Sequence, residues 1–306
     1  MEIITGTEEF HIEADTAVAI GKFDGVHLGH RRILEEILKK REEGLRSCVF
    51  TFDPSPAVLF GKGDVRELTT REEKRLLLQR MGVEILIEYP LSYETAATPP
   101  EAFVRETLIG RLGASLLAAG PDLSFGAGGK GDLALLRRLA PESGLEIREI
   151  PKLLFADGEE TKEISSSLIR SFVEAGRMEE AGECLGTPYP ILGQVVPGAH
   201  LGHTLGFPTV NVEIPEEKLL PPFGVYTSVV TVEGREYTGI TNIGCKPTVT
   251  SGRRPLAETY LYDFDEEIYG KEVLIGLKSF KRPERKFPDV EALKEQLRQD
   301  IESCRP

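Results

Sequence analysis

The sequence lacks most features of a secreted, membrane-bound or metal-scaffolded protein. Its four cysteines are far apart and form no C-x-x-C pair, so neither a disulfide framework nor a cysteine-based zinc site is indicated. No apolar run approaches the ~18 residues of a membrane span, and the acidic amino terminus has no apolar signal core. We therefore expect a soluble, cytoplasmic protein with no membrane partner.

Excess positive charge is also missing. Lys and Arg total 37 against 50 Asp and Glu, which gives a net charge of −13. A chain this acidic is a poor candidate for binding nucleic acid unless it has a strong local basic patch. The basic stretches here are short and interrupted, so we expect no nucleic-acid partner. The sequence does not indicate an oligomeric state.

The chain does have the length and pattern of two domains of different class. In the first half, apolar strand candidates alternate with amphipathic helix candidates, which predicts a parallel, doubly wound, Rossmann-like sheet. After about residue 185, strand candidates separated by turn residues predict an antiparallel barrel or sandwich, closed by a terminal helix over 288–304. Gly and Pro punctuate residues 182–194, which are expected to form a linker.

In the first half, the pattern predicts strands over 16–23, 46–52, 83–90 and 114–120, and helices over 31–44, 71–82 and 99–113. In the second half, it predicts strands over 192–198, 225–234, 235–244, 256–264 and 272–280.

The tetrapeptide HLGH occurs at 27–30 and again at 200–203. The first copy follows a strand candidate and precedes a helix candidate, and a helix N-terminus presents free N–H groups that suit phosphate. Gly29 would let a phosphate approach closely. His27 and His30 could donate hydrogen bonds to phosphate oxygens during phosphoryl or nucleotidyl transfer. The alternative is a solvated helix start with a chance histidine pair. A zinc site built from both copies would have to join two domains and is disfavoured.

Two further segments of the first half could contact a nucleotide. The glycine-rich loop at 120–132 matches G-x-G-x-x-G but does not follow an apolar strand directly, so it is either a loop near a ligand or a flexible loop. Ser166, Ser167 and Arg170 lie at a helix start, where serines often only cap the helix. The same groups could hold phosphate oxygens.

The second half contains hard oxygen ligands and an isolated carboxylate. Thr209 and Asn211 are two residues apart in an extended segment, so their side chains share one side and could bind Mg²⁺. The alternative is a Pro-Thr-x-Asn turn. Glu258 shares a strand face with Leu256 and Tyr260, and a carboxylate among such neighbours is costly unless it is paired. The alternative is an exposed glutamate on an edge strand.

Long motifs of the chain resemble those of one family. "AIGKFDGVHLGHRRIL", "GPDLSFGAGGKGD" and "ISSSLIR" resemble the nucleotidyltransferase half of the prokaryotic bifunctional riboflavin kinase/FAD synthetase family, and "LGFPTVNV", "TNIGCKPTV", "AETYLYDFDEEIYGK" and "FKRPERKF" resemble its riboflavin kinase half. The resemblance implies an FMN adenylyltransferase (FAD synthetase) domain of Rossmann-like α/β fold over 1–185. It also implies an all-β barrel kinase domain with a terminal helix over 186–306.

The resemblance implies two reactions with ATP as co-substrate and Mg²⁺ as cofactor. Riboflavin is phosphorylated to FMN in the kinase domain, and FMN is adenylylated to FAD, with release of pyrophosphate, in the other domain. For the adenylyltransferase it implies nucleotide contacts at His27, Gly29, His30, Ser166, Ser167 and Arg170, and flavin contacts at Asp122 and Phe125.

For the kinase, the resemblance implies that Glu258 is the general base for the ribityl 5′-hydroxyl and that Thr209 and Asn211 bind Mg²⁺. It implies an ATP loop with Gly198, Gly202, His203 and Thr204, and flavin contacts at Arg282, Glu284 and Phe287. The second HLGH copy falls in this ATP loop and is most simply a chance match to the first.

Several positions differ from the family's motifs. Ser55, Ser124, His203 and Tyr260 stand where other residues are usual, and His203 replaces a fixed positive charge. These differences predict altered phosphate or flavin affinity. An alternative stays open, in which only one activity is retained and the other domain is a flavin- or nucleotide-binding module.

Overall fold

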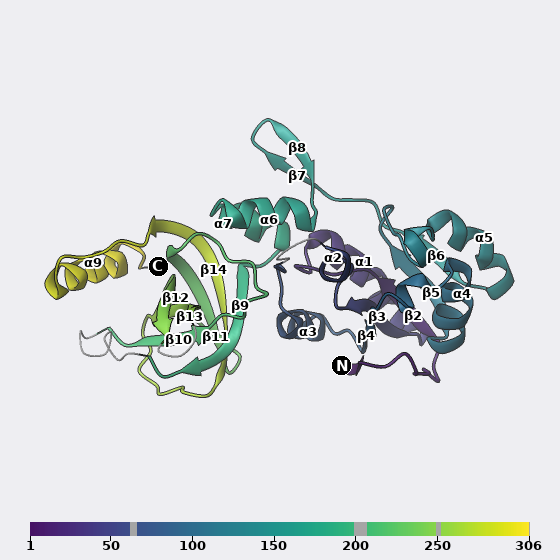
Figure 1. Cartoon of the computed structure of the whole chain (residues 1–306), viewed down its shortest axis with the longest axis horizontal. Coiled ribbons are helices and arrows are strands. Elements are labelled where there is room, and N and C mark those ends of the chain that lie inside the picture. Colours follow the sequence, from purple (N-terminus) through teal and green to yellow (C-terminus); the bar gives the residue numbers. More distant parts are fainter. Residues whose placement is uncertain (62–65, 199–206, 249–251, 306) are drawn as a thin grey trace. The chain divides into compact units, whose positions relative to one another are not determined.

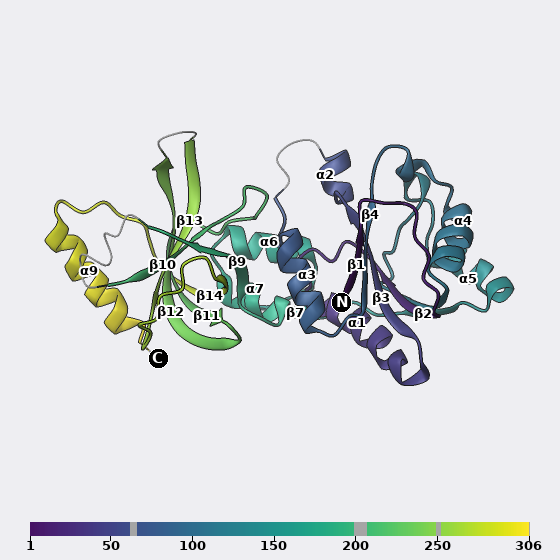
Figure 2. The same cartoon turned by 90° about the horizontal axis from the view of Figure 1, so that it is seen from below.

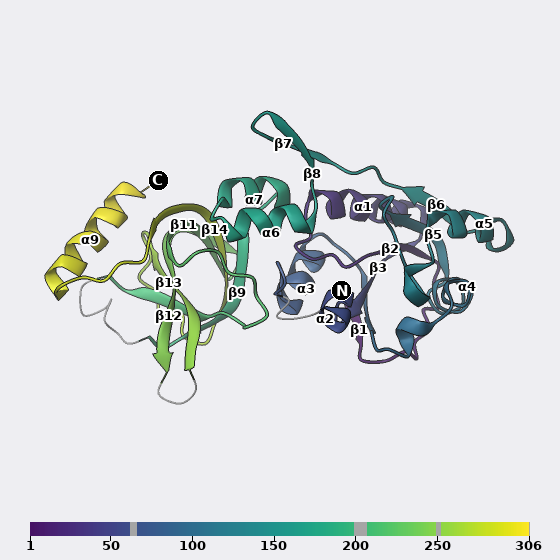
Figure 3. The same cartoon turned by 45° about the horizontal axis from the view of Figure 1, so that its top comes forward.

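The computed structural model describes residues 1–61, 66–198, 207–248 and 252–305 (Figures 1 to 3). These residues form two compact units, each described by itself below. The first unit consists of Met1–Val65 and Lys74–Ser165, and the second of Arg66–Glu73 and Ser166–Pro306. No helix among the described residues is long and apolar enough to cross a membrane.

The first unit is built on a parallel six-stranded sheet in the order β1-β4-β3-β2-β5-β6. Its strands are β1 (Glu2–Thr5), β2 (Thr16–Ile20), β3 (Arg46–Asp53), β4 (Ile85–Pro90), β5 (Ala114–Ala119) and β6 (Glu146–Glu149). The doubly wound sheet and its four expected strands are therefore confirmed. The strands β1 and β6 at its two edges were not expected, and neither was the separate hairpin of β7 (Leu154–Asp157) and β8 (Glu160–Glu163).

Helices cover both faces of this sheet because alternate residues of its central strands point to opposite sides. The α-helices are α1 (Leu28–Lys39), α2 (Pro56–Phe60), α3 (Arg71–Arg80), α4 (Pro100–Ala102) and α5 (Leu133–Ser143). Shorter or wider helical turns are η1 (Lys40–Glu43), η2 (Thr95–Ala97), the π-helix η3 (Phe103–Arg111) and η4 (Ala127–Gly129). The helix expected over 99–113 is thus present, mostly as a π-helix.

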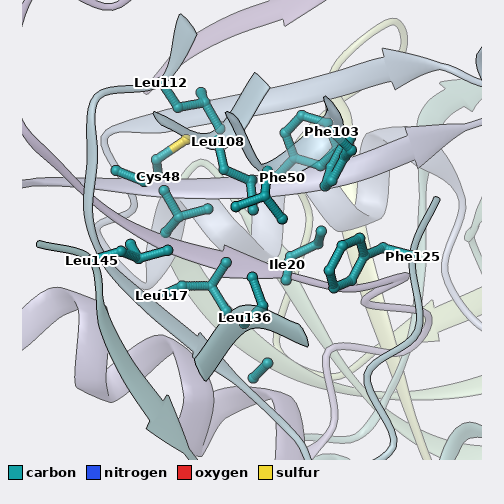
Figure 4. Close-up of a cluster of buried hydrophobic side chains, with 14 of the residues drawn as sticks. Ile20, Cys48, Phe50, Phe103, Leu108, Leu112, Leu117, Phe125, Leu136 and Leu145 are labelled. Atoms are coloured by element: carbon teal, nitrogen blue, oxygen red, sulfur yellow. The ribbon is translucent and has the colours of Figure 1, made fainter. Parts of the chain in front are cut away.

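Two apolar cores result, one on each face of the sheet. On one face, Ile20 and Phe50 of the sheet pack with Phe103, Leu108 and residues of α5 (Figure 4). On the other face, alanines and valines of the same strands pack with α1 and with Leu77 and Leu78 of α3. This arrangement leaves the turn between β2 and α1 at the carboxyl end of a central strand, where ligands bind in sheets of this type.

The second unit is a closed antiparallel barrel in the order β10-β13-β12-β11-β14-β9. Its strands are β9 (Tyr189–Val196), β10 (Thr209–Glu213), β11 (Gly224–Val232), β12 (Arg235–Thr248), β13 (Gly252–Leu261) and β14 (Glu272–Pro283). Two helices, α6 (Ser166–Glu174) and α7 (Met178–Leu185), precede the barrel, and α9 (Val290–Ser303) follows it. The predicted barrel and terminal helix are confirmed.

The linker expected over 182–194 is wrong. Helix α7 runs to Leu185, and Tyr189 and Ile191 are buried on β9. The Gly and Pro residues mark only a tight turn at Gly186, whose φ of 72° suits glycine. Pro190 is compatible with a strand because, in the described part of the barrel, this end of β9 pairs with β14 alone.

A short segment from the first half of the sequence belongs to the second unit. Glu67 bridges to Lys218, whose side chain is fully buried. Lys218 Nζ lies 2.6 Å from Glu73 Oε2 and donates to the Leu68 carbonyl at 2.6 Å. Glu73 Oε2 also accepts the N–H of Thr70 in a capping box at the start of α3. The buried charge of Lys218 is thus paired and hydrogen-bonded, as burial requires.

Candidate active sites

In the first unit, a tight turn between β2 and α1 places two histidines together. Phe23, Gly25 and Val26 have φ values of 51°, 85° and 44°. Such a conformation is costly for the β-branched Val26, and costs of this kind cluster at functional sites. The turn delivers His27 to the N-cap of α1.

His27 and His30, the histidine pair, are stacked. Their ring centroids lie 3.7 Å apart with an interplanar angle of 22°. His27 Nδ1 accepts the backbone N–H of His30 at 3.4 Å, so the neutral ring of His27 carries its proton on Nε2. A Cβ at position 29 would lie 3.1 Å from the His27 ring, and Gly29 therefore leaves room for the stack.

Burial keeps both histidines neutral near pH 7. It lowers the pKa of His27 to about 4, although the carboxylates of Asp24 and Asp122 act to raise it. Burial also lowers the pKa of His30 well below its ordinary value, and His27 and the ammonium of Lys74 lower it further. The pair can therefore donate and accept hydrogen bonds while it carries no charge near pH 7.

One ring nitrogen of the pair lacks a partner. His30 Nδ1 is buried and has no hydrogen bond to any described residue. Buried polar atoms are nearly always hydrogen-bonded, so an atom of this kind calls for a ligand or water. The alternative of a fully solvated helix start does not fit this burial.

The glycine-rich loop at 120–132 is ordered. Phe125 and Gly131 exchange two backbone hydrogen bonds, of 3.0 and 2.9 Å. The Phe125 ring is 3% exposed and packs on Phe103 (Figure 4). Asp122 at the start of the loop is exposed, pairs with Lys152 at 3.5 Å, and acts electrostatically on His27. The loop therefore lies near the histidine pair.

An exposed aromatic pair of the same unit was not predicted. Phe60 and Tyr93 are 52% and 73% exposed, and their ring centroids are 5.8 Å apart in an edge-to-face arrangement. The signal for it in the sequence is weak, because Phe60 ends the five-residue helix α2 and Tyr93 lies in a loop. Exposed rings of this kind offer a surface for a flat aromatic ligand.

The serine-rich segment begins α6 and falls in the second unit. Ser166 is half-buried and Ser167 exposed, while Ile169 is buried. The guanidinium of Arg170 donates to the backbone carbonyl of Arg66. The predicted nucleotide contacts of the adenylyltransferase are thus divided between the two units.

In the second unit, the barrel aligns five residues that are far apart in the sequence. The register pairs successive residues on β10, β13, β12, β11 and β14, and we call them the outer row: Asn211, Glu258, Asn242, Val225 and Arg282. Residues paired directly across strands point to one face. The next residues along, Thr241 and Thr259, bond each other inside the barrel at 2.9 Å, so the row lies on the outer face.

Asn211 carries an unpaired buried oxygen at one end of the row. Its side chain is 4% exposed, and Nδ2 donates to the Thr209 carbonyl at 3.2 Å. Its Oδ1 is buried and has no hydrogen-bond partner among the described residues. A Cβ at Gly198 would lie 2.5 Å from Asn211 Nδ2, so the backbone there lies directly against the amide. An amide oxygen beside Glu258 fits a hard cation.

At the other end of the row, Arg282 of β14 and Glu284, one residue beyond the end of this strand, are charged residues with partners. Arg282 Nε and Nη2 donate to Asp300 of α9 at 3.0 and 2.5 Å. Glu284 Oε1 accepts from Asn242 Nδ2 at 3.1 Å. Asp300 and Asn242 were not among the predicted site residues, because neither spacing nor composition reveals which strands and helices will be neighbours.

Thr209 is half-buried at the start of β10, opposite Tyr260 of β13. Phe287 is half-buried between β14 and α9. Gly202, His203 and Thr204 lie outside the described residues. No group of three or more His, Cys, Asp or Glu that could hold a metal occurs in the described part of the chain.

Comparisons with known proteins find a family match in each half of the chain. A FAD synthetase family model matches residues 9–168, and a riboflavin kinase family model matches residues 185–306. Bifunctional riboflavin kinase/FMN adenylyltransferases from Listeria monocytogenes and Bacillus subtilis are 35% and 36% identical, over 96% and 98% of this chain and 92% and 96% of theirs. A solved structure from Streptococcus pneumoniae, described as a macrolide-efflux protein, covers 99% of this chain and 98% of its own, with a TM-score of 0.84 and 30% identity.

The two family matches cover nearly the whole chain in the order that the motifs predicted, and the curated relatives combine the same two domains. The predicted resemblance is therefore confirmed, and the chain belongs to the family of bifunctional riboflavin kinase/FMN adenylyltransferases.

Proposed function

We propose that this chain makes FAD from riboflavin in two ATP-dependent steps. Residues 186–306 phosphorylate riboflavin to FMN, and residues 1–185 adenylylate FMN to FAD and release pyrophosphate. One observation carries the proposal. Among the described residues, just two buried side-chain polar atoms lack a hydrogen-bond partner, His30 Nδ1 and Asn211 Oδ1. One lies at each predicted phosphate or metal site.

In the adenylylation, an FMN phosphate oxygen attacks the α-phosphorus of ATP and pyrophosphate leaves. The neutral rings of His27 and His30 donate hydrogen bonds to the phosphate oxygens as charge develops there. Gly29 lets the phosphates approach the start of α1. Ser166, Ser167 and Arg170 contact the same nucleotide.

The flavin of this half-reaction contacts Asp122 and Phe125. The exposed rings of Phe60 and Tyr93 add a surface on which a flat ring system can pack.

In the kinase reaction, Glu258 takes the proton of the ribityl 5′-hydroxyl as that oxygen attacks the γ-phosphorus of ATP and ADP leaves. Thr209 and Asn211 would hold Mg²⁺, which neutralises phosphate charge when it is bound. Arg282, Glu284 and Phe287 contact the flavin. Gly198, Gly202, His203 and Thr204 belong to the ATP loop. Because both reactions consume ATP, we assign the protein to the cytoplasm.

A product assay tests the proposal. Purified protein with riboflavin, ATP and Mg²⁺ should give FMN and then FAD by chromatography. His27→Ala combined with His30→Ala should stop FAD formation and leave FMN formation intact. Glu258→Ala should stop FMN formation and still allow added FMN to become FAD. Formation of neither product by the wild-type protein would reject the proposal.

The same assay decides the alternative of a single activity. Riboflavin and FMN are supplied in separate reactions, so each half-reaction is measured independently. If just one product forms, the other domain is a binding module, as the departures at Ser55, Ser124 and Tyr260 leave open.

A further inference from the structure

Asn242 occupies the middle of the outer row, between the predicted base and the predicted flavin contacts. On one side Asn242 pairs with Glu258 of the neighbouring strand β13, and on the other side it pairs with Val225 of the neighbouring strand β11. Because directly paired residues point to one face, its amide projects from the same surface as the Glu258 carboxylate. None of the roles implied for the chain falls on this residue.

The Asn242 amide and a glycine together form a seat for the Glu284 carboxylate. Asn242 Nδ2 donates to Glu284 Oε1 at 3.1 Å. A Cβ at Gly244 would lie 2.1 Å from that same oxygen, and 3.3 Å from Asn242 Nδ2. The carboxylate therefore rests directly against the backbone of β12, in space that any side chain at 244 would fill.

The seated carboxylate keeps most of its capacity to accept hydrogen bonds. Glu284 is exposed, and an ionised carboxylate offers about four lone-pair sites. Among the described side chains, Asn242 alone donates a hydrogen bond to this carboxylate, so acceptor sites remain for a substrate. A carboxylate attracts hydroxyl and imide N–H donors and repels phosphate. Riboflavin carries such donors on its ribityl chain and ring, whereas the ATP phosphates carry none.

An amide is the side chain that the position requires. Aspartate at 242 would remove the donor and would place three acidic residues in succession, at 258, 242 and 284. Alanine would remove the donor and release the Glu284 carboxylate. Asparagine supplies a donor without adding charge.

We propose that Asn242 is a positioning residue for the riboflavin kinase reaction: it seats Glu284 against Gly244 as an acceptor for the hydroxyl or imide donors of the flavin substrate. The inference rests on the proposed kinase function. It adds a residue on β12 that acts through Glu284 and keeps the surface between Glu284 and Glu258 uncharged.

Steady-state kinetics of riboflavin phosphorylation test the role of Asn242. Asn242→Ala should raise KM for riboflavin about tenfold, the loss expected for one hydrogen bond to a charged group, and leave kcat within about twofold. Glu284→Gln should raise KM similarly, and the double variant should be no worse than either single variant. Glu236→Gln, an exposed charge on the same strand, should change none of these values.

Gly244→Ala tests the seat without removing the amide. The added Cβ should displace the Glu284 carboxylate and reproduce the rise in KM. FMN adenylylation, assayed with added FMN on the same preparations, controls for folding in every variant.

An unchanged KM in both Asn242→Ala and Gly244→Ala would overturn the inference, and so would fully additive effects of Asn242→Ala and Glu284→Gln. These outcomes differ from failure of the proposed function, in which the wild-type protein itself forms no FMN.

Discussion

The histidine pair and the outer row each leave one buried polar atom for a ligand, but they are built in opposite ways. The histidine pair comes from consecutive residues, in a turn with three left-handed φ values that leads into α1. The outer row comes from five barrel strands, with residues from 211 to 282 brought into register. In the first site, local backbone conformation fixes the positions of the side chains. In the second site, the hydrogen bonds between the barrel strands fix them.

The two sites also differ in charge. Burial lowers the pKa values of His27 and His30, so both rings are neutral near pH 7. The outer row contains a carboxylate and a guanidinium, each beside a polar partner. A neutral pair can bind and release phosphates without a permanent charge, whereas the row suits a proton transfer beside a cation. Substitutions in one site should therefore change the properties of that site and leave those of the other site unchanged.

The largest expected effect is on the barrel side. Asp300→Ala leaves the largely buried Arg282 without its carboxylate, and the free energy of unfolding of the second unit should fall by about 3 kcal/mol. Urea unfolding measures it. Glu302→Ala, at an exposed position of α9, should cost less than about 0.5 kcal/mol. Equal losses in the two variants would contradict a specific role for the Arg282–Asp300 pair.

The next effect is on the histidine side and depends on pH. Unfolded His27 takes up a proton near its ordinary pKa of 6.5, whereas in the folded protein it does so near 4. The first unit should therefore lose stability as the pH falls through this window, by about 2 kcal/mol between pH 6.5 and 5 from His27 alone. His27→Gln should reduce the pH dependence, and His11→Gln, at an exposed position, should not. The same pH slope in both variants would contradict the assignment.

A smaller effect concerns the Mg²⁺ requirement, which should change for one of the two reactions and not for the other. Asn211→Ala removes the unpaired oxygen at the end of the outer row and should raise the Mg²⁺ concentration for half-maximal FMN formation about tenfold, the equivalent of roughly 1.4 kcal/mol. The Mg²⁺ requirement of FMN adenylylation, titrated on the same preparation, is the control and should not move. A parallel shift in both titrations would argue against a kinase site for the metal at Asn211.

The smallest effect concerns the histidine stack. Gly29→Ala places a Cβ 3.1 Å from the His27 ring, which must shift by a few tenths of an ångström. FMN adenylylation should fall a few-fold, while the free energy of unfolding stays equal or rises, since alanine favours helix by about 1 kcal/mol. Gly182→Ala in α7, where the nearest atom is 3.6 Å away, tests helix propensity alone and should leave adenylylation unchanged.

Local features of the fold could be predicted from the sequence. Ile33, Leu34 and Ile37 recur at helical spacing within the helix expected over 31–44, and all three are buried on α1. The HLGH motif indicated a phosphate site because its residues are consecutive and precede a helix. Strands β1 and β6 gave no such signal, because each has only four residues and charged side chains within it.

Contacts between distant residues could not be predicted. The pairing of Asn242 with Glu284 and of Arg282 with Asp300 depends on the strand register and on where α9 packs. The spacing of residues in the sequence reveals neither of these. The linker prediction failed for a related reason. Gly186 and Pro190 suggested a break, but the neighbouring apolar side chains are buried by the barrel.

The segment Arg66–Glu73 has a consequence for dividing the gene. A coding sequence cut at residue 186 yields a kinase fragment that contains Lys218 and the Tyr189 ring beneath its ammonium, but neither Glu73 nor the Leu68 carbonyl, which accept hydrogen bonds from that ammonium. Such a fragment must bury the ammonium without these two hydrogen-bond acceptors or release it to water by local unfolding. The protein therefore has two structural units, but the second unit is not one continuous segment of the sequence. Recombination at a single point would not transfer an intact kinase unit.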